Sequence, residues 1–413
     1  MGTGVLVVGL PFAFPVEAAA ATRGGDLYFV KTRNTTSGRA EVHSATAASG
    51  YGKAGVHRAT YIDAAEADNG FYELVGSDLY FIKTRNTTSG RIEIHSATAA
   101  SGYTTGGHRT TYLDVAEGDN GHYQLVGSDL YFIKTKNTTS GRIELHSATA
   151  ASGYQTAGVH RATYIDAAEG GNGFYQMVGS DLYFIKTKNT TSGRIEVHST
   201  TAASGYQKGG IHKVTLLKAG EGDNGFYQMV GSDLYFIKTK NTTSGRVEVH
   251  SVTAASGYRS AGSHHATFIK AEEAANGWFQ VPSQLESYRA WALNRRNWNG
   301  RTATGRPGIE ADGSAGARAA DLGVAWAQWM GHPSGFTARD LRTVSRPGWL
   351  PVPGNLGKAR PGDVITRVGG KQHLVVVLAA PAKGVVKVLQ QGPGSPSVAS
   401  YPTSTTGVLW RLG

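Results

Sequence analysis

The sequence predicts a multidomain protein in which an all-β repeat array is followed by a separate α+β domain. Five near-copies of one unit fill the first two thirds of the chain, at spacings of 52, 51, 52 and 52 residues. The copies stop near Val281, and the composition changes from Pro282 onward. A period of this length indicates that each copy is one supersecondary unit. Each copy contains the string Asp-Leu-Tyr-Phe, which begins at Asp26, Asp78, Asp129, Asp181 and Asp233.

The fourth copy shows how many strands one unit contains. Residues 182–185 are apolar on both faces, and the turn-forming residues 189–193 follow them. Residues 194–198 alternate apolar and polar side chains, which is typical of a strand with one buried face. Residues 213–217 and 226–230 are rich in apolar residues and predict a third and a fourth strand.

Four short strands in each of five units are typical of a β-propeller with one blade per repeat. An open β-solenoid is the main alternative, but its coils are usually shorter and its terminal units atypical. We therefore predict a five-bladed propeller over residues 23–281. The sequence leaves open how the ring closes.

Residues 283–413 have the composition of a different fold. Segments 287–293 and 319–329 have helix-forming composition, and 351–358 is a Pro- and Gly-rich connection. Two expected strands, 373–378 and 385–390, follow it, and residues 407–411 form a third apolar segment. Helices followed by a run of strands predict an α+β domain.

The positive charge of the chain is concentrated in this second part. The whole chain of 413 residues has a net charge of +11, whereas residues 283–413 alone have 16 Lys+Arg and 6 Asp+Glu, a net of +10. A basic domain is attracted to nucleic acid, anionic lipid or anionic wall polymers, and a solvated basic surface is an equally good interpretation. A nucleic-acid partner is disfavoured, because neither a clustered basic helix nor an aromatic RNA-binding motif is present.

The absence of cysteine restricts the chemistry. With no Cys in the chain, disulfides, thiolate catalysis and Cys-based metal sites are impossible. We predict neither a cofactor nor a metal site. Residues 1–22 resemble a signal peptide, with an apolar run from Val5 to Phe14 and small residues after it, so secretion is expected. No segment reaches the roughly 20 apolar residues that a membrane span needs.

Aromatic and imidazole side chains recur in every copy of the array. Each copy has a tyrosine beside a Gly-rich loop, and five equivalent weak sites would bind a polyvalent glycan surface with high avidity. The predicted carbohydrate-binding residues are Tyr51, Tyr103, Tyr154, Tyr206 and Tyr258, with the histidines His57, His108, His160, His212 and His264. Both sets are expected to face solvent. Arg39, Glu41 and His43 are candidates as well, or else form a buried network between blades.

The array resembles propeller lectins of the tachylectin type and lectin-like repeats of secreted actinobacterial proteins. The similarity covers residues from about 23 to 281, and Asp233–Thr242 and Gly245–His250 show it most clearly. It implies a β-propeller fold and binding to glycans on cell surfaces or on the bacterial cell wall.

The second part resembles the CHAP family of cysteine- and histidine-dependent amidohydrolases/peptidases, which have a papain-like α+β fold. The matching motifs are Asp312 to Leu322, Gly362-Asp363-Val364 and Gly407 to Arg411. The resemblance places the family nucleophile at Ala319, the oxyanion-stabilising Gln at Arg318 and the catalytic histidine at His373. A simple hairpin between the two expected strands would put Gln390 opposite His373 as the orienting residue.

An alanine side chain cannot act as a nucleophile. Two interpretations follow. In the first, the protein is a secreted glycan-binding lectin whose CHAP-like domain is inactive and binds peptidoglycan peptide or a partner. In the second, the parent protein is a peptidoglycan hydrolase whose catalytic cysteine has been replaced at Ala319.

Overall fold

The structure, a computed structural model, describes residues 25–76 and 78–282 and several segments beyond residue 348. Those segments are 349–352, 356, 359, 364–366, 374–377, 385–391, 396–405 and 408–412. The helical segments expected at 287–293 and 319–329 lie outside the described residues, as do residues 1–22. No helix among the described residues is long and apolar enough to cross a bilayer.

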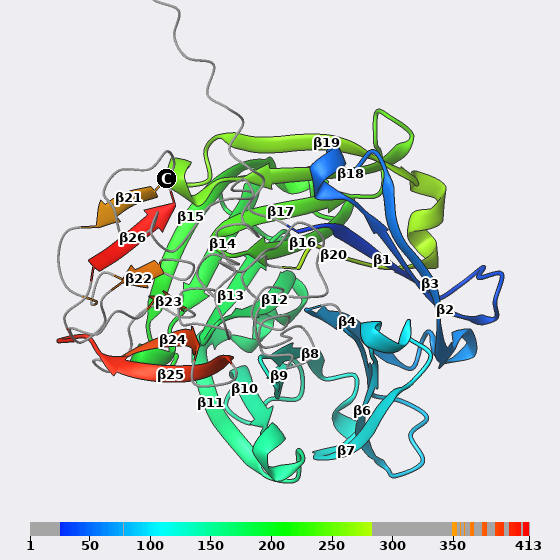
Figure 1. Cartoon of the computed structure of the whole chain (residues 1–413), viewed down its shortest axis with the longest axis horizontal. Helices are drawn as coiled ribbons and strands as arrows, with labels where there is room; N and C mark the ends of the chain where they lie inside the picture. The colour runs from blue at the N-terminus through cyan, green and yellow to red at the C-terminus, as the bar shows by residue number, and fades with distance from the viewer. Residues whose placement is uncertain are drawn as a thin grey trace, which may run out of the picture.

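Five four-stranded antiparallel sheets form the repeat array (Figure 1). The first sheet contains β1 (Leu27–Lys31), β2 (Arg39–Ala45), β3 (Ala54–Asp63) and β20 (Gly277–Gln280). The second sheet contains β4 (Gly70–Val75), β5 (Asp78–Lys83), β6 (Arg91–Ala97) and β7 (Gly106–Asp114). The third sheet contains β8 (Gly121–Val126), β9 (Asp129–Lys134), β10 (Arg142–Ala148) and β11 (Ala157–Asp166).

The fourth and fifth sheets repeat this pattern. The fourth sheet contains β12 (Gly173–Val178), β13 (Asp181–Lys186), β14 (Arg194–Thr200) and β15 (Gly209–Lys218). The fifth sheet contains β16 (Gly225–Val230), β17 (Asp233–Lys238), β18 (Arg246–Val252) and β19 (Ala261–Lys270). The sheets are propeller-like blades, which confirms the all-β repeat architecture predicted from the sequence.

The grouping of strands into blades differs from the predicted one. The last strand of each copy does not join its own copy but begins the next sheet, so that 225–230 lies in the fifth blade rather than the fourth. The pattern of apolar residues locates a strand, but it does not tell which neighbour the strand pairs with. Consequently the final strand, β20, has only the first copy left to pair with.

Pairing of β20 with β1 closes the ring. Tyr28 is opposite Gln280 and Phe29 is opposite Phe279, and the two phenylalanine rings stack at 4.6 Å. The backbone amide of Thr32 also donates to the carbonyl of Asn276 at 2.7 Å. Closure therefore uses strands from the two ends of the array, and β20 completes the four-stranded sheet of the first blade.

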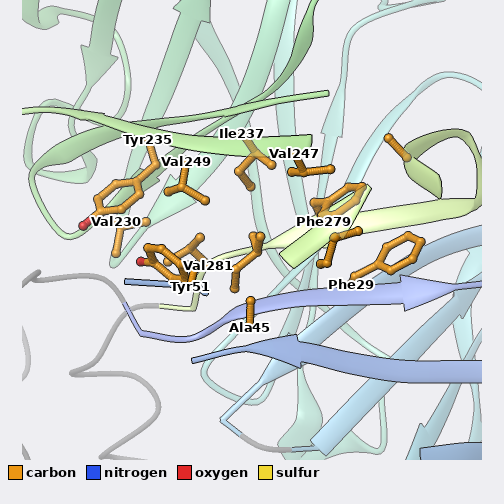
Figure 2. Packing of buried hydrophobic residues seen from close by; sticks show 13 residues of the cluster. Phe29, Ala45, Tyr51, Val230, Tyr235, Ile237, Val247, Val249, Phe279 and Val281 are labelled. Carbon is orange, nitrogen blue, oxygen red and sulfur yellow. The ribbon is translucent and has the colours of Figure 1, made fainter. Parts of the chain in front are cut away.

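Each hydrophobic core of the array lies between two consecutive blades. The cluster at the closure joins Leu27, Phe29 and Tyr51 of the first copy to Tyr235 and Phe279 of the last (Figure 2). Four more clusters repeat this arrangement around the ring. A blade therefore buries its apolar faces only against its neighbours, as expected for repeat units that are not stable alone.

The innermost strands are also connected by side-chain amides. Nε2 of Gln176 donates to the carbonyl of Met229 at 3.0 Å, and the amide of Met229 donates back to Oε1 at 2.7 Å. The same two-way bridge to backbone joins Gln124 to Met177. It also joins Gln228 to Val281 and Gln280 to Leu74. The equivalent residue in the second blade is Glu73, which accepts from the amide of Leu125 at 2.7 Å.

The described segments of the C-terminal part form one six-stranded antiparallel sheet in the order β21-β26-β22-β23-β24-β25. Its strands are β21 (Trp349–Val352), β22 (Val364–Thr366), β23 (Leu374–Val377), β24 (Val385–Gln391), β25 (Pro396–Pro402) and β26 (Val408–Leu412). Strands β23, β24 and β26 coincide largely with the apolar segments expected at 373–378, 385–390 and 407–411. The sequence did not predict β25, and β21 includes Pro351, which was expected to begin a connecting segment. Pro351 is compatible with its place because β21 is an edge strand.

Candidate functional site

The second and third strands of each blade bring one glutamate and two histidines together. In the first blade, Glu41 and His43 are two residues apart on β2 and therefore lie on the same face of the strand. His57 on β3 is the direct cross-strand partner of His43. The five clusters are Glu41–His43–His57, Glu93–His95–His108, Glu144–His146–His160, Glu196–His198–His212 and Glu248–His250–His264. We call each of these a Glu–His–His cluster.

The geometry of the cluster repeats closely around the ring. Oε2 of the glutamate lies 3.2–3.4 Å from Nε2 of the first histidine in all five blades. It lies 3.5–3.9 Å from Nε2 of the second histidine in four blades. The two imidazole rings stack, with centroids 4.2–4.6 Å apart. One carboxylate oxygen therefore faces two imidazole nitrogens.

The other oxygen of the buried carboxylate is fixed by the hairpin turn. Oε1 of Glu41 accepts hydrogen bonds from the hydroxyl of Ser37 at 2.8 Å and from its amide at 3.3 Å. Burial raises the pKa of Glu41, but the hydrogen bonds from Ser37 and His43 outweigh it and hold the pKa below its usual value. In Glu144 the same opposing effects, with Ser140 as the main donor, lower the pKa to about 2. The carboxylate is therefore ionised at neutral pH.

The first histidine of each cluster is partly buried. Burial lowers the pKa of His43, and the hydrogen bond to Glu41 only partly offsets this effect. The pKa of His95, His146, His198 and His250 is lowered for the same main reason. These imidazoles are therefore neutral at neutral pH, and the one that donates from Nε2 to the carboxylate carries its lone pair on Nδ1.

The second histidine of each cluster is exposed to solvent, which confirms the exposure expected for His57, His108, His160, His212 and His264. In the first blade 65% of the His57 side chain is accessible, compared with 20% for His43. A cationic residue follows in most copies, namely Arg58, Arg109, Arg161 or Lys213. His265 takes this place in the fifth blade.

The tyrosines expected to face solvent belong to the core instead, and that expectation was wrong. Tyr51, Tyr103, Tyr206 and Tyr258 are buried, and Tyr154 is partly buried. Each follows a glycine with positive φ and itself has a φ of 64–68°. This left-handed backbone directs the ring between blades, where the Tyr206 hydroxyl donates to the carbonyl of Ser180 at 2.8 Å. Buried rings cannot offer a stacking surface to a sugar.

Other aromatic residues are partly exposed where two blades meet. The amide of Tyr61 donates to the carbonyl of Tyr103 in the next blade at 3.0 Å, and its hydroxyl donates to the carbonyl of Ser96 at 2.9 Å. The same backbone bond recurs at each junction, from Tyr112, Tyr164, Leu216 and Phe268. Four of the five junctions therefore place a partly exposed aromatic ring on the outer strand.

Arg39, Glu41 and His43 do not form the buried network between blades that the sequence allowed as an alternative. The Glu41 carboxylate is bonded within its own blade. The Arg39 guanidinium is exposed and donates to the carbonyl of Tyr61, on the neighbouring strand of the same sheet, at 2.9 Å.

Of the four positions predicted to be catalytic, only Gln390 is described. Ala319, Arg318 and His373 lie outside the described residues. Gln390 pairs with Val375, so the expected pairing of Gln390 with position 373 was wrong by two residues. A simple hairpin count assumed a turn centred one residue too early, and turn geometry sets register. Oε1 of Gln390 accepts a hydrogen bond from the Tyr401 hydroxyl at 2.6 Å.

The Glu–His–His cluster as a unit was not predicted, although the sequence contains a signal for it. Every copy has Glu-x-His on the second strand and another histidine 13 or 14 residues later. Glu-x-His places both side chains on one face of a strand. Only the register of β2 against β3 shows that the later histidine lies opposite the first.

Comparisons with known proteins do not assign the chain to a family. No family model matches the sequence, and no curated protein matches it. One solved structure, titled "Bifunctional GH43-CE Bacteroides eggerthii", aligns over 96% of this chain and 54% of its own length, with 11% identity and a TM-score of 0.33. The chain thus spans about half the length of that protein. A similarity at this level shows neither a shared fold nor a shared activity.

Proposed function

We propose that this protein is a secreted, multivalent glycan-binding protein that attaches to carbohydrate on cell surfaces or on the bacterial cell wall. The observation that carries the proposal is the five-fold repetition of an exposed histidine, the second of each cluster, which is followed in four copies by an exposed cation. A protein with one catalytic site would have no use for five equivalent surfaces on one ring.

The exposed groups are suited to hydroxyl-rich ligands. Imidazole and guanidinium groups bond to hydroxyls, and in the first blade Arg58 also donates to the carbonyl of His57 at 2.8 Å. The partly exposed aromatic rings at the junctions, such as Tyr61, replace the buried tyrosines as candidates for stacking against a sugar. Each site alone would be weak, but several sites on a rigid ring gain avidity.

A direct test measures how retention depends on the number of intact sites. Replacing Arg58, Arg109 and Arg161 by alanine, one after another, should lower retention of the full chain on glycan-coated beads in steps, by ~10² or more for the triple variant. The matched control replaces Arg33, Arg85 and Lys136, exposed cations on the hairpin turns, and loses the same charge. The proposal fails if no glycan on a broad array retains the protein, or if both triple variants lose retention equally.

For the C-terminal part we propose the first of the two interpretations given above, a CHAP-like domain that binds wall peptide without turnover. It rests on the motif resemblance and on the absence of cysteine from the chain. The net charge of +10 over residues 283–413 should add attraction to anionic wall polymers, and added salt should weaken it.

The alternative, a peptidoglycan hydrolase whose cysteine has been replaced, makes a different prediction. Restoring a thiol with Ala319→Cys should then release amino groups from purified peptidoglycan, and a thiol-blocking reagent should abolish the release. Adding Arg318→Gln should increase it, since one oxyanion donor is typically worth about 10²–10³ in rate. If both variants remain folded and inert, the second interpretation is rejected.

A further inference from the structure

The Glu–His–His clusters contain the ligand types and the spacing of a metal site. From this geometry we infer that each blade binds one divalent transition-metal ion, with zinc as the ion that fits best. The ligands would be Oε2 of the glutamate and Nε2 of both histidines, with each imidazole in the tautomer that carries its proton on Nδ1. The inference does not depend on glycan binding, because it rests on the arrangement of three side chains within a single blade.

The distances support one shared ion. Zinc bonds to imidazole nitrogen and carboxylate oxygen are about 2.0–2.1 Å long, and tetrahedral ligands at that distance lie about 3.3 Å apart. Oε2 of Glu93 lies 3.4 Å from Nε2 of His95 and 3.5 Å from Nε2 of His108. In every blade the three ligand atoms lie within 4.8 Å of one another. To complete the geometry, the exposed His108-type side chain would rotate out of its stack on the first histidine, so that both nitrogen lone pairs meet at the ion.

The ligands are attached to a rigid support. Both histidines of a cluster lie on paired strands and are direct cross-strand partners in all five blades. The Glu41 carboxylate is oriented by Ser37 through Oε1, which leaves Oε2 directed at the histidines. Hydrogen bonds that fix a ligating carboxylate in this way are the usual outer shell of a metal site.

The third blade supplies an independent observation. Among the described residues, Nε2 of His146 is buried and makes no well-aligned hydrogen bond. It nevertheless lies 3.4 Å from Oε2 of Glu144. A buried imidazole nitrogen with only a poorly aligned contact is less stable than a well-bonded one, and a metal ion between Glu144, His146 and His160 would satisfy it.

The ligand set favours zinc over the alkaline-earth ions. Calcium and magnesium prefer six or more oxygen ligands, whereas imidazole is typical of zinc, copper and nickel. Two histidines and one glutamate are also the protein ligands of several catalytic zinc sites, where the remaining position is open. Since His57-type side chains are exposed, an ion bound here would be accessible to water and to external ligands.

The fifth blade offers a matched pair of variants. His264 belongs to the cluster, and the next residue, His265, belongs to none. Both lie on β19, so His264→Ala and His265→Ala remove the same chemical group from the same strand. The inference predicts that only the first variant loses a binding site. A second variant pair, His264→Ala with and without His57→Ala, extends the series to a second blade.

The experiment uses the full chain, stripped of metal with a chelator and titrated with Zn²⁺ by calorimetry. Cobalt(II) serves as a spectroscopic probe, since a tetrahedral site gives an intense visible absorption. We expect about five equivalents for the wild type and for His265→Ala, about four for His264→Ala and about three for the double variant. The cobalt absorption should fall in the same proportion.

Two results would overturn the inference. One is a wild-type stoichiometry clearly below five ions per chain. The other is an equal stoichiometry for His264→Ala and His265→Ala, which would place the bound metal on other histidines. Circular dichroism checks that each variant is folded, and if His264→Ala is unfolded, His57→Ala and His212→Ala are each compared with His265→Ala instead.

Discussion

The side-chain amide of Gln280 forms two hydrogen bonds with the backbone of Leu74, 206 residues away in the sequence. Its Nε2 donates to the Leu74 carbonyl at 3.0 Å, and its Oε1 accepts from the Leu74 amide at 2.7 Å. This bridge connects the last innermost strand to that of the second blade, and it is the same bridge that Gln124, Gln176 and Gln228 make. Closure of the ring therefore repeats an internal contact rather than adding a special one.

Glu73 is the exception in this set, and it leads to the first prediction. An ionised carboxylate accepts hydrogen bonds but cannot donate one, whereas glutamine does both. We expect Glu73→Gln to complete the two-way bridge to Leu125 and to stabilise the protein by about 1 kcal/mol. The measurement is urea denaturation followed by tryptophan fluorescence and circular dichroism.

The reverse substitution is the control for this prediction. Gln176→Glu removes the donor to the Met229 carbonyl and should destabilise the protein by a similar amount or more. Equal stabilities for the wild type and both variants would show that the amide bridges contribute nothing.

The repeat array could be predicted from its sequence because its strands repeat a strong pattern. Apolar alternation and turn residues located the strands, and the fivefold period predicted the blades. The pairing of β20 with β1 could not be predicted in the same way, because the pattern does not specify a strand's partner. Tyr51 was misplaced for a related reason. Its Gly-rich neighbourhood signals a turn, but the direction of its ring depends on a φ of 64° that only the structure gives.

The second prediction concerns the strength of the closure. Phe279 is buried and stacks on Phe29, so Phe279→Ala should destabilise the protein by about 3–5 kcal/mol. Phe268 on β19 is only partly buried, and Phe268→Ala should cost clearly less. Hydrogen exchange of the β1 amides provides a local readout, and faster exchange there is expected for Phe279→Ala alone. Indistinguishable denaturation curves for the two variants would mean that closure by β20 contributes little.

The third prediction separates the core tyrosines from the junction aromatics. Tyr206 is buried, so Tyr206→Ala should destabilise the protein by about 3–5 kcal/mol. Glycan retention per folded molecule should stay the same. Tyr164 is partly exposed, so Tyr164→Ala should weaken retention with a much smaller loss of stability. Retention on glycan-coated beads and thermal unfolding, measured on the same samples, give both quantities. A loss of retention caused by Tyr206→Ala in fully folded protein would show that the loop tyrosines take part in glycan binding.

The last prediction concerns alkaline pH. Burial raises the pKa of many tyrosines of the array well above the usual value, among them Tyr51, Tyr72, Tyr123, Tyr175 and Tyr227. In the unfolded chain these hydroxyls lose their protons near pH 10, about their usual pKa, whereas the folded protein keeps them. The unfolded state therefore binds fewer protons above about pH 10, and the free energy of unfolding must fall as pH rises. Below that pH these groups do not affect the pH dependence.

Denaturation by urea at several pH values, together with tyrosinate absorbance, tests this directly. We expect the folded protein to show only a fraction of the absorbance of its 19 tyrosines above about pH 10, with the rest appearing cooperatively on unfolding. Tyr206, buried and with a raised pKa, is one contributor. Tyr206→Phe removes one group that loses its proton in the unfolded state but keeps it in the folded state. The fall of the unfolding free energy with rising pH should therefore become shallower by up to about 1.4 kcal/mol per pH unit. If all tyrosines of the folded wild type titrate together near pH 10, their rings are accessible to solvent, and the packing of the blades described above is wrong.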